Sequence, residues 1–365
     1  MHKSLMNSLY ALVAIAATVV LSEARAAEPD TGATAPFTVV VLPDTQFYSE
    51  SYPDTYLAQA EWIRRRAEAD NVRFVFHLGD IVENAAVEQE WIHADRAHRV
   101  LDGVVPYSVA PGNHDLETTG DQLTRGSTLY NKYFGPQRFE KHSWYGGHEG
   151  ETNDNNYCFF EAAGGKYMVL SLEFSPHDDV LRWADGVVAS HPDRRVIVAT
   201  HCYMRPDGRD QKTSQFKGLA GNSGEEIWEK FVRKHPNIFL VVSGHVAGVG
   251  HQTSTNDAGL PVHEILADYQ KLPEGGDGWL ITLRFVPAEN VIRVEAYSPT
   301  LDEHNADPKH SYTLPFNVIP DNSILVPPNS TSQAAKRKPD ASDYCVELHK
   351  WAHEDSNLGP RPYQF

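Results

Sequence analysis

Short apolar segments alternate with helical patterns through the first two thirds of this chain, and this alternation limits the folds open to it. We expect strands at 37–42, 72–78, 106–110, 157–161, 167–174, 195–200 and 238–243, and helices at 56–69, 87–101, 180–189 and 225–234. Strands that alternate with helices predict a largely parallel sheet covered on both faces. After residue 259 the strands come closely spaced, at 262–267, 279–286 and 291–297, which predicts an antiparallel addition to the same body.

Composition restricts the partners of the chain. The 365 residues carry 32 Lys and Arg against 49 Asp and Glu, so the net charge is −17, and 41% of residues are hydrophobic. This is enough apolar material for a packed core, and the acidity argues against binding nucleic acid, whose phosphates select basic surfaces. It does not exclude a phosphorylated small molecule, because bound metal ions can supply positive charge locally.

The ends of the chain look different from its middle. Residues 1–26 predict a secretory signal peptide, with Lys3, an apolar run of about 13 residues and the small-residue site Ala24-Arg25-Ala26. That run is shorter than the roughly 20 residues that span a bilayer. We therefore expect an exported protein, secreted or periplasmic, with no membrane span after cleavage. We further expect one domain over 36–318 and a C-terminal tail of low order over 319–365.

Two other features receive structural interpretations. The three cysteines include no Cys-x-x-Cys pair, so Cys158 and Cys202, inside apolar runs, are expected to be small buried side chains. Residues 120–156 lack periodicity and predict a long surface loop beside a binding face.

Polar residues of the metal-ligand type follow five of the expected strands. They are Asp44 and Gln46 after the first strand, Asp80 after the second, Asn113, His114 and Asp115 after the third, His201 after 195–200, and His245 after 238–243. Each alone could be a turn residue or a core histidine. Together they predict one metal site, because ligands bind at the carboxyl edge of parallel strands.

The order of these motifs, with Gly79-Asp80 and Gly112-Asn113-His114-Asp115 between them, resembles the calcineurin-like metallophosphoesterase superfamily over about residues 37–246. The resemblance implies an α/β sandwich of two mixed β-sheets flanked by helices, and a two-metal hydrolase of phosphate mono- or diesters.

The resemblance also implies a role for each motif residue. Asp80 would bridge two ions and Asp44 would hold the first. The second ion would be bound by Asn113, His201 and His245. His114 would meet the substrate, with Asp115 orienting its ring.

These residue types suit such chemistry. Two cations about 3.5–4 Å apart need a shared anionic ligand, and together they activate a water for attack on phosphorus. A nearby imidazole can donate a proton to the leaving oxygen, and a carboxylate beside it fixes the ring.

Two positions depart from the family pattern, and both concern the first ion. Gln46 and Ala247 stand where the family usually has histidines. Asp44, Asp80 and the Gln46 carbonyl would then form an oxygen-rich site suited to Mg²⁺, Mn²⁺ or Ca²⁺. The second site keeps its imidazoles and suits Mn²⁺, Fe or Zn²⁺. We expect one tightly held ion and one that exchanges easily.

Several readings stay open on the sequence. His251 could replace a missing imidazole or be an exposed loop histidine. Asp268 could orient a ligand histidine or belong to a surface turn, and Tyr48 could line the substrate pocket or be a packed tyrosine. The leading function is an exported metal-dependent phosphoesterase acting on a small-molecule, lipid or polymer phosphate ester. The alternative is a metal-dependent binding protein whose first metal site is degraded and which has no turnover.

Overall fold

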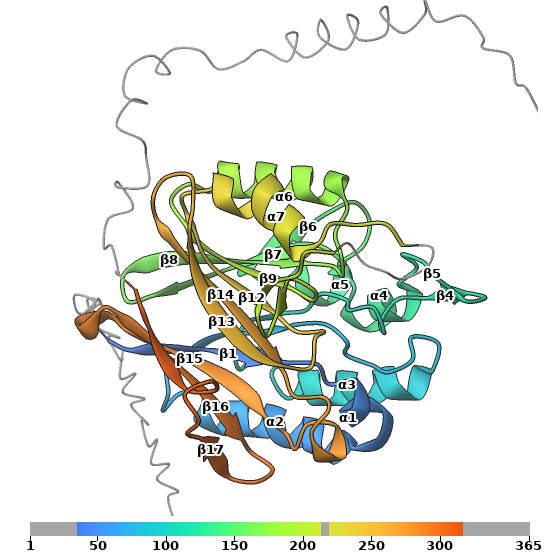
Figure 1. The fold of residues 1–365 in the computed structure, drawn as a ribbon. Helices are drawn as coiled ribbons and strands as arrows, with labels where there is room; N and C mark the ends of the chain where they lie inside the picture. The colour runs from blue at the N-terminus through green and yellow to red at the C-terminus, as the bar shows by residue number, and fades with distance from the viewer. Residues whose placement is uncertain (1–34, 213–218, 317–365) are drawn as a thin grey trace, which may run out of the picture.

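A computed structural model describes residues 35–212 and 219–316 and shows two β-sheets facing each other, with helices outside them (Figure 1). The first sheet has the order β17 (Glu303–Asn305), β16 (Val291–Ser298), β15 (Leu280–Val286), β1 (Phe37–Leu42), β2 (Val72–His77) and β3 (Tyr107–Ser108), with β18 (Tyr312–Pro315) paired to β16. The second has the order β13 (Gly248–Thr255), β14 (Pro261–Asp268), β12 (Ile238–Ser243), β9 (Arg195–Thr200), β8 (Gly165–Leu172), β7 (Asn156–Ala162) and β6 (Tyr145–His148).

Both sheets are mixed. The strands β1, β2 and β3 are parallel, as are β8, β9, β12 and β14, while the remaining pairs in the two sheets are antiparallel. The two mixed sheets confirm the fold that the family resemblance implied. The single, largely parallel sheet expected from the alternation alone is wrong, because the parallel strands divide into two groups whose inner faces pack together.

The core between the sheets explains why the strands read as continuous apolar runs. Every residue of β1 is buried, and inward side chains such as Phe37 and Phe74 meet Phe160 and Tyr167 of the second sheet. A strand covered on both faces has no solvent-facing side to carry polar residues. Periodicity could not show which sheet each strand joins.

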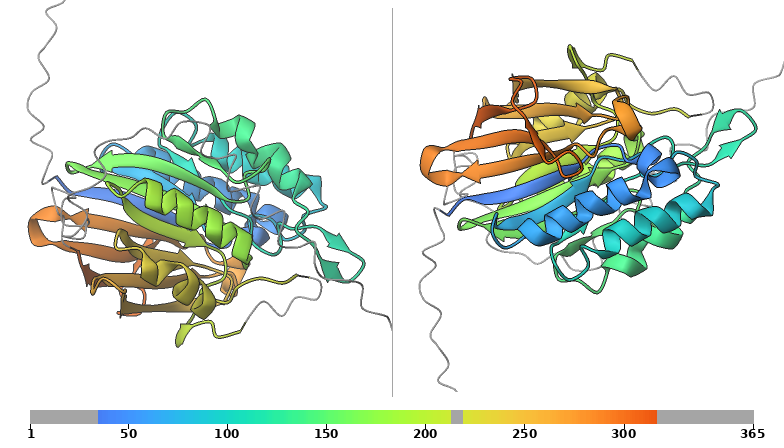
Figure 2. Two further views of the ribbon diagram at one scale, coloured as in Figure 1. Left: turned by 90° about the horizontal axis from the view of Figure 1, so that it is seen from above. Right: turned by 90° about the horizontal axis from the view of Figure 1, so that it is seen from below.

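Helices cover the two outer faces (Figure 2). The first sheet is covered by α1 (Gln46–Ser51), α2 (Pro53–Arg66), α3 (Glu88–Arg99), α4 (Thr128–Phe134) and α5 (Pro136–Phe139), and the second by α6 (Asp178–Ser190) and α7 (Gly224–Lys230). Short pieces complete the described chain: β4 (Thr118–Thr119), β5 (Gln122–Leu123), β10 (Met204–Arg205), β11 (Gly208–Arg209), and the 3₁₀ turns η2 (Val232–Lys234), η3 (Pro273–Gly275) and η4 (Pro287–Glu289).

The prediction of a long surface loop over residues 120–156 is wrong. It contains α4, α5 and β6, and its side chains Tyr130, Phe134 and Phe139 are buried against the first sheet. Helices of four to seven residues are too short for their apolar residues to show a helical period in the sequence. Only their aromatic side chains indicated that this segment is buried.

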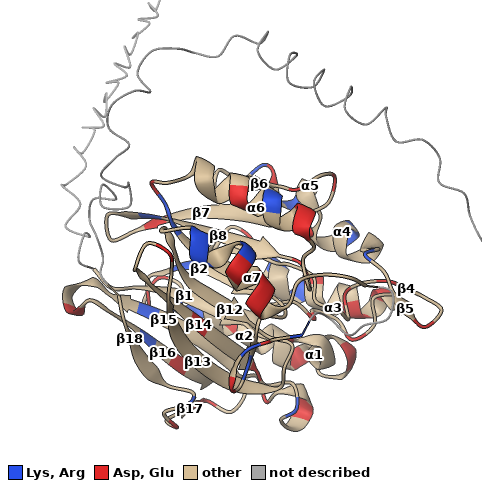
Figure 3. Ribbon diagram, turned by 45° about the horizontal axis from the view of Figure 1, so that its top comes forward, with Lys and Arg blue, Asp and Glu red and all other residues tan. Residues whose placement is uncertain are grey.

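The expected signal peptide and tail lie outside the described residues. Across residues 35–212 and 219–316, no helix has both the length and the apolar character needed to cross a bilayer. Cys158 and Cys202 are buried, as expected, and neither forms a disulfide within the part of the chain that the structure describes. Lys and Arg are scattered among Asp and Glu over the coloured elements in Figure 3 rather than gathered along one stripe.

Acidification should destabilise the fold through His98. This ring is buried in α3, 4.8 Å from the Phe134 ring, and burial, aided by Arg138, lowers its pKa to about 4. The unfolded state, with a histidine pKa of about 6.5, takes up the proton first as pH falls, so stability decreases from pH 6.5 towards pH 4. Between pH 7 and pH 5 the wild type should lose about 2 kcal/mol more than His98→Gln in urea unfolding.

The matched control for this measurement is His93→Gln, a half-buried position on the same helix. Equal losses in the wild type and in His98→Gln would show that His98 does not cause the pH dependence.

Candidate active site

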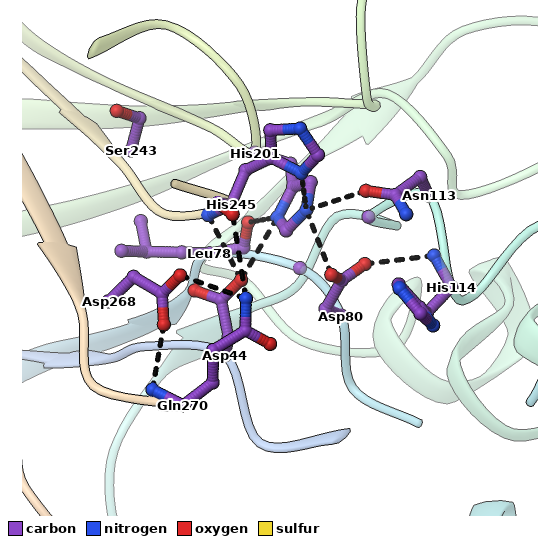
Figure 4. Close-up of polar contacts among 12 residues, drawn as sticks. Asp44, Leu78, Asp80, Asn113, His114, His201, Ser243, His245, Asp268 and Gln270 are labelled. Atoms are coloured by element: carbon purple, nitrogen blue, oxygen red, sulfur yellow. Dashed lines mark hydrogen bonds and ion pairs between the residues drawn. The ribbon is translucent and has the colours of Figure 1, made fainter. Parts of the chain in front are cut away.

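Side chains from both sheets meet at one edge of the sandwich, where the parallel strands end (Figure 4). Asp44 follows β1, Asp80 follows β2 and Asn113 follows β3 in the first sheet, while His201 follows β9 and His245 follows β12 in the second. The structure thus brings together the residues that the sequence placed at separate strand ends.

Three possible ligand atoms gather around the Nε2 atom of His201, itself a fourth. This nitrogen lies 3.1 Å from Asp80 Oδ2, 3.2 Å from Asn113 Oδ1 and 3.2 Å from His245 Nδ1. The ring's other nitrogen, Nδ1, lies 2.9 Å from the Leu78 carbonyl, which can accept only from an N–H, so Nε2 is left free to bind a cation. We call Asp80, Asn113, His201 and His245 the histidine half of the site.

This donor set fits a divalent transition metal. Ligand atoms of Asp80, His201 and His245 all lie within 4.8 Å of one another. Metal–ligand bonds of about 2.0–2.2 Å in tetrahedral or octahedral geometry put neighbouring ligand atoms roughly 3.0–3.5 Å apart. The separations around His201 fall in that range, so an ion would need little rearrangement of the side chains.

The oxygen-rich half lies beside it and consists of Asp44, Gln46 and the shared Asp80. Asp44 is buried and accepts the His245 N–H at 3.0 Å, but its Oδ2 and the Gln46 Oε1 have no hydrogen-bond partner among the described residues. Burial, together with the charges of Asp268 and Asp80, raises the Asp44 pKa well above its usual value. A bound cation would offset this repulsion, so the residues present fit a metal here too.

The glycines of the motifs are required by close packing. A Cβ atom at Gly112 would lie 2.2 Å from the backbone nitrogen and Oδ1 of Asp80, and one at Gly244 would lie 2.2 Å from Asp44 Oδ2. Asp80 and His245 themselves have positive φ angles, +50° and +71°, which non-glycine residues seldom adopt. Such strain gathers at functional sites, where the surrounding structure imposes it.

His114 stands at the edge of the cluster, beside a cleft. Its backbone N–H donates to Asp80 Oδ1 at 2.9 Å, and its ring Nδ1 lies 2.9 Å from the Glu83 carbonyl and 3.2 Å from a Glu83 carboxylate oxygen. Burial lowers the ring's pKa, but the charges of Asp80 and Glu83 and the Glu83 carbonyl outweigh it, and the net pKa is raised. The cleft has a volume of about 720 Å³ and is lined by Asn113, His114, Glu83, Glu117 and others.

The role expected for Asp115 is corrected. Its carboxylate accepts from the backbone N–H groups of Gly112, Ile81 and Val82, at 2.8 to 3.1 Å, and so ties the two ligand loops together. The group that contacts the His114 ring is instead Glu83. Glu83 lies 31 positions earlier in the chain, so sequence proximity pointed to the wrong carboxylate.

His77, which sequence reasoning missed, also joins ligand loops. Its Nδ1 accepts the Gly79 N–H at 3.0 Å, so its Nε2 carries the proton and donates to Thr45 Oγ1 at 2.9 Å. Burial lowers its pKa well below the usual value, which keeps the ring neutral for both bonds. The sequence feature that could have identified His77 is its position as the last residue of β2, two residues before Gly79-Asp80.

Of the three residues whose roles the sequence left open, one belongs to the site and two do not. Asp268 belongs to the site, since its charge raises the Asp44 pKa, and Gln270 lies beside it. His251 stacks on Tyr312 with ring centroids 3.8 Å apart, on the exposed part of β13. Tyr48 is buried and its hydroxyl accepts the Gly278 N–H, so it is a packed tyrosine.

Comparisons with known proteins agree with this geometry. The family model of calcineurin-like phosphoesterases matches residues 37–249. An uncharacterised protein of Bacillus subtilis, YvnB, is 36% identical over 276 residues, which is 74% of this chain and 20% of that protein. This chain therefore spans about a fifth of that relative.

Solved structures share the fold. The purple acid phosphatase PPD1 from yellow lupin seeds superposes with a TM-score of 0.51 at 13% identity, covering 83% of this chain and 58% of that one. At this identity the likeness concerns the fold alone. On the family match, which covers more than half of its residues, the chain belongs to the calcineurin-like phosphoesterase family.

Proposed function

We propose that this protein is an exported metal-dependent phosphoesterase that hydrolyses a phosphate mono- or diester. One observation carries the proposal: carboxylate, amide and imidazole ligand atoms lie within 3.2 Å of His201 Nε2, and His114 stands beside them at the edge of a cleft. Family membership supports a two-metal centre. The signal-peptide pattern of residues 1–26 supports export.

Some side chains of the site would bind the metal ions, and His114 would transfer a proton. When bound, divalent cations lower the pKa of water and draw charge from the phosphoryl oxygens. Asp80 lies 3.1 Å from His201, and its charge acts on the Asp44 carboxyl, so its carboxylate would be the shared ligand. The His114 ring is held by Glu83 and faces the cleft, where it can donate a proton to the leaving oxygen.

The test is a panel of phosphate esters. Chelated protein should be inactive on p-nitrophenyl phosphate and bis-p-nitrophenyl phosphate, and adding Mn²⁺, Mg²⁺, Ca²⁺ or Zn²⁺ should restore hydrolysis with at least one metal. Folded protein that binds metal but hydrolyses neither ester nor an alkyl diester would point to the binding-protein alternative. In the same expression culture, export predicts a product in the periplasm or medium whose N-terminus is Ala27.

A further inference from the structure

A third buried oxygen lies near the oxygen-rich half of the site. Besides Asp44 Oδ2 and Gln46 Oε1, the Oε1 atom of Gln270 is shielded from solvent and has no hydrogen-bond partner in the part of the chain that the structure describes. Burying an acceptor without a donor is unfavourable, so such atoms call for an explanation. A cation is one partner that would satisfy all three.

The orientation of the Gln270 amide is fixed by its neighbours. Its nitrogen donates to Asp268 Oδ2 at 3.0 Å and to the His245 carbonyl at 3.5 Å, while the Gln270 backbone N–H donates to Asp268 Oδ1 at 2.8 Å. Turning the amide over would set its oxygen against the Asp268 carboxylate and the carbonyl, and both of these only accept. The oxygen therefore faces away from Asp268 (Figure 4).

The same contacts place this amide against the metal ligands. The His245 residue whose carbonyl receives the Gln270 amide also gives its N–H to Asp44 at 3.0 Å. Asp268 is close enough to Asp44 for its charge to act on the Asp44 carboxyl. Gln270, which follows β14 of the second sheet, is thus linked through His245 to Asp44, whereas Gln46 is the first residue of α1, after β1 of the first sheet.

We propose that Gln270 Oε1 is a ligand of the ion held by Asp44, and that Asp268 is a positioning residue that aims the amide. This inference rests on the two-metal centre of the proposed function. The ion would then have amide and carboxylate oxygens from Asp44, Gln46, Asp80 and Gln270 and no imidazole. Hard cations such as Mg²⁺, Mn²⁺ and Ca²⁺ prefer such a set, whereas Zn²⁺ favours the histidine half.

The experiment measures metal binding by titration calorimetry on the full chain after chelation, with Mn²⁺, Mg²⁺ and Zn²⁺ in turn. Wild type should show a tight and a weaker Mn²⁺ class. Gln270→Leu, of similar size but without the oxygen, should weaken the weaker class about tenfold or more and leave the tight class unchanged.

The matched control is Gln252→Leu, another half-buried glutamine, which donates its amide to Glu264 from the neighbouring strand β13. It should bind both ions as wild type does. Wild-type constants for Gln270→Leu, or a single Mn²⁺ class in the wild type, would each overturn the proposal. Because binding is read without turnover, failure to hydrolyse any ester would reject the proposed function and leave this result standing.

Discussion

Replacing Asp80 with Asn is expected to reduce hydrolysis by on the order of a thousandfold or more and to release bound metal. Asp80 is buried, its Oδ2 lies 3.1 Å from His201 Nε2, and its Oδ1 accepts the His114 N–H. Although burial raises its pKa, the His201 contact lowers it overall, so the group is a carboxylate that both halves of the site can share. The asparagine keeps the shape and the acceptor but removes the charge that separates two cations.

The measurement pairs the rate constant on p-nitrophenyl phosphate with the metal content of the purified protein. The matched control is Asp154→Asn, another buried aspartate, whose carboxylate accepts from Ser127 and Asn131 away from the site. The control should keep its metal and its activity. Two retained ions in Asp80→Asn, together with activity within tenfold of wild type, would contradict the bridging role.

His114→Ala is expected to lower kcat by about a hundredfold to ten-thousandfold while leaving metal binding unchanged. The His114 ring is absent from the atoms gathered around His201, and its contact to Asp80 uses the backbone N–H, which alanine retains. If the ring donates a proton, the loss should be larger for an alkyl phosphate ester, whose leaving oxygen needs that proton, than for a p-nitrophenyl ester.

Glu83→Gln gives the comparison for this variant. The glutamine keeps the size of the side chain that contacts the His114 ring, and it keeps the backbone carbonyl that lies 2.9 Å from the ring's Nδ1. Its effect on kcat should be smaller than that of His114→Ala and should follow the same leaving-group order. A loss below tenfold on both esters in His114→Ala would remove the ring from the reaction, and an equal loss on both would leave it a substrate contact without proton transfer.

The candidate metal ligands could be chosen from the sequence because each is defined locally. Asp44, Asp80, Asn113, His201 and His245 each directly follow a buried strand or stand within a few residues of its end. Parallel strands deliver their carboxyl ends to one edge, so position along the chain already implied position in space. The glycines beside them carried the same information, since the packing at Gly112 and Gly244 admits no larger residue.

Contacts between these loops could not be chosen in the same way. The family resemblance implied that the adjacent Asp115 orients His114, yet Asp115 binds backbone N–H groups and Glu83 contacts the ring. Which carboxylate reaches the ring depends on how the loop after β2 folds against the loop after β3, and no residue type in either loop encodes that.

The sequence alone determined which residue types stand at which strand ends, because burial of a strand and the turn that follows it are properties of a few neighbouring residues. Only the tertiary structure decided that the strands divide into two facing sheets, and that Gln270, after β14, is linked through His245 to Asp44, after β1. These pairings depend on packing between surfaces far apart in the chain. Hydrophobic burial drives that packing, but its free energy is nondirectional, so the apolar pattern does not name the partner.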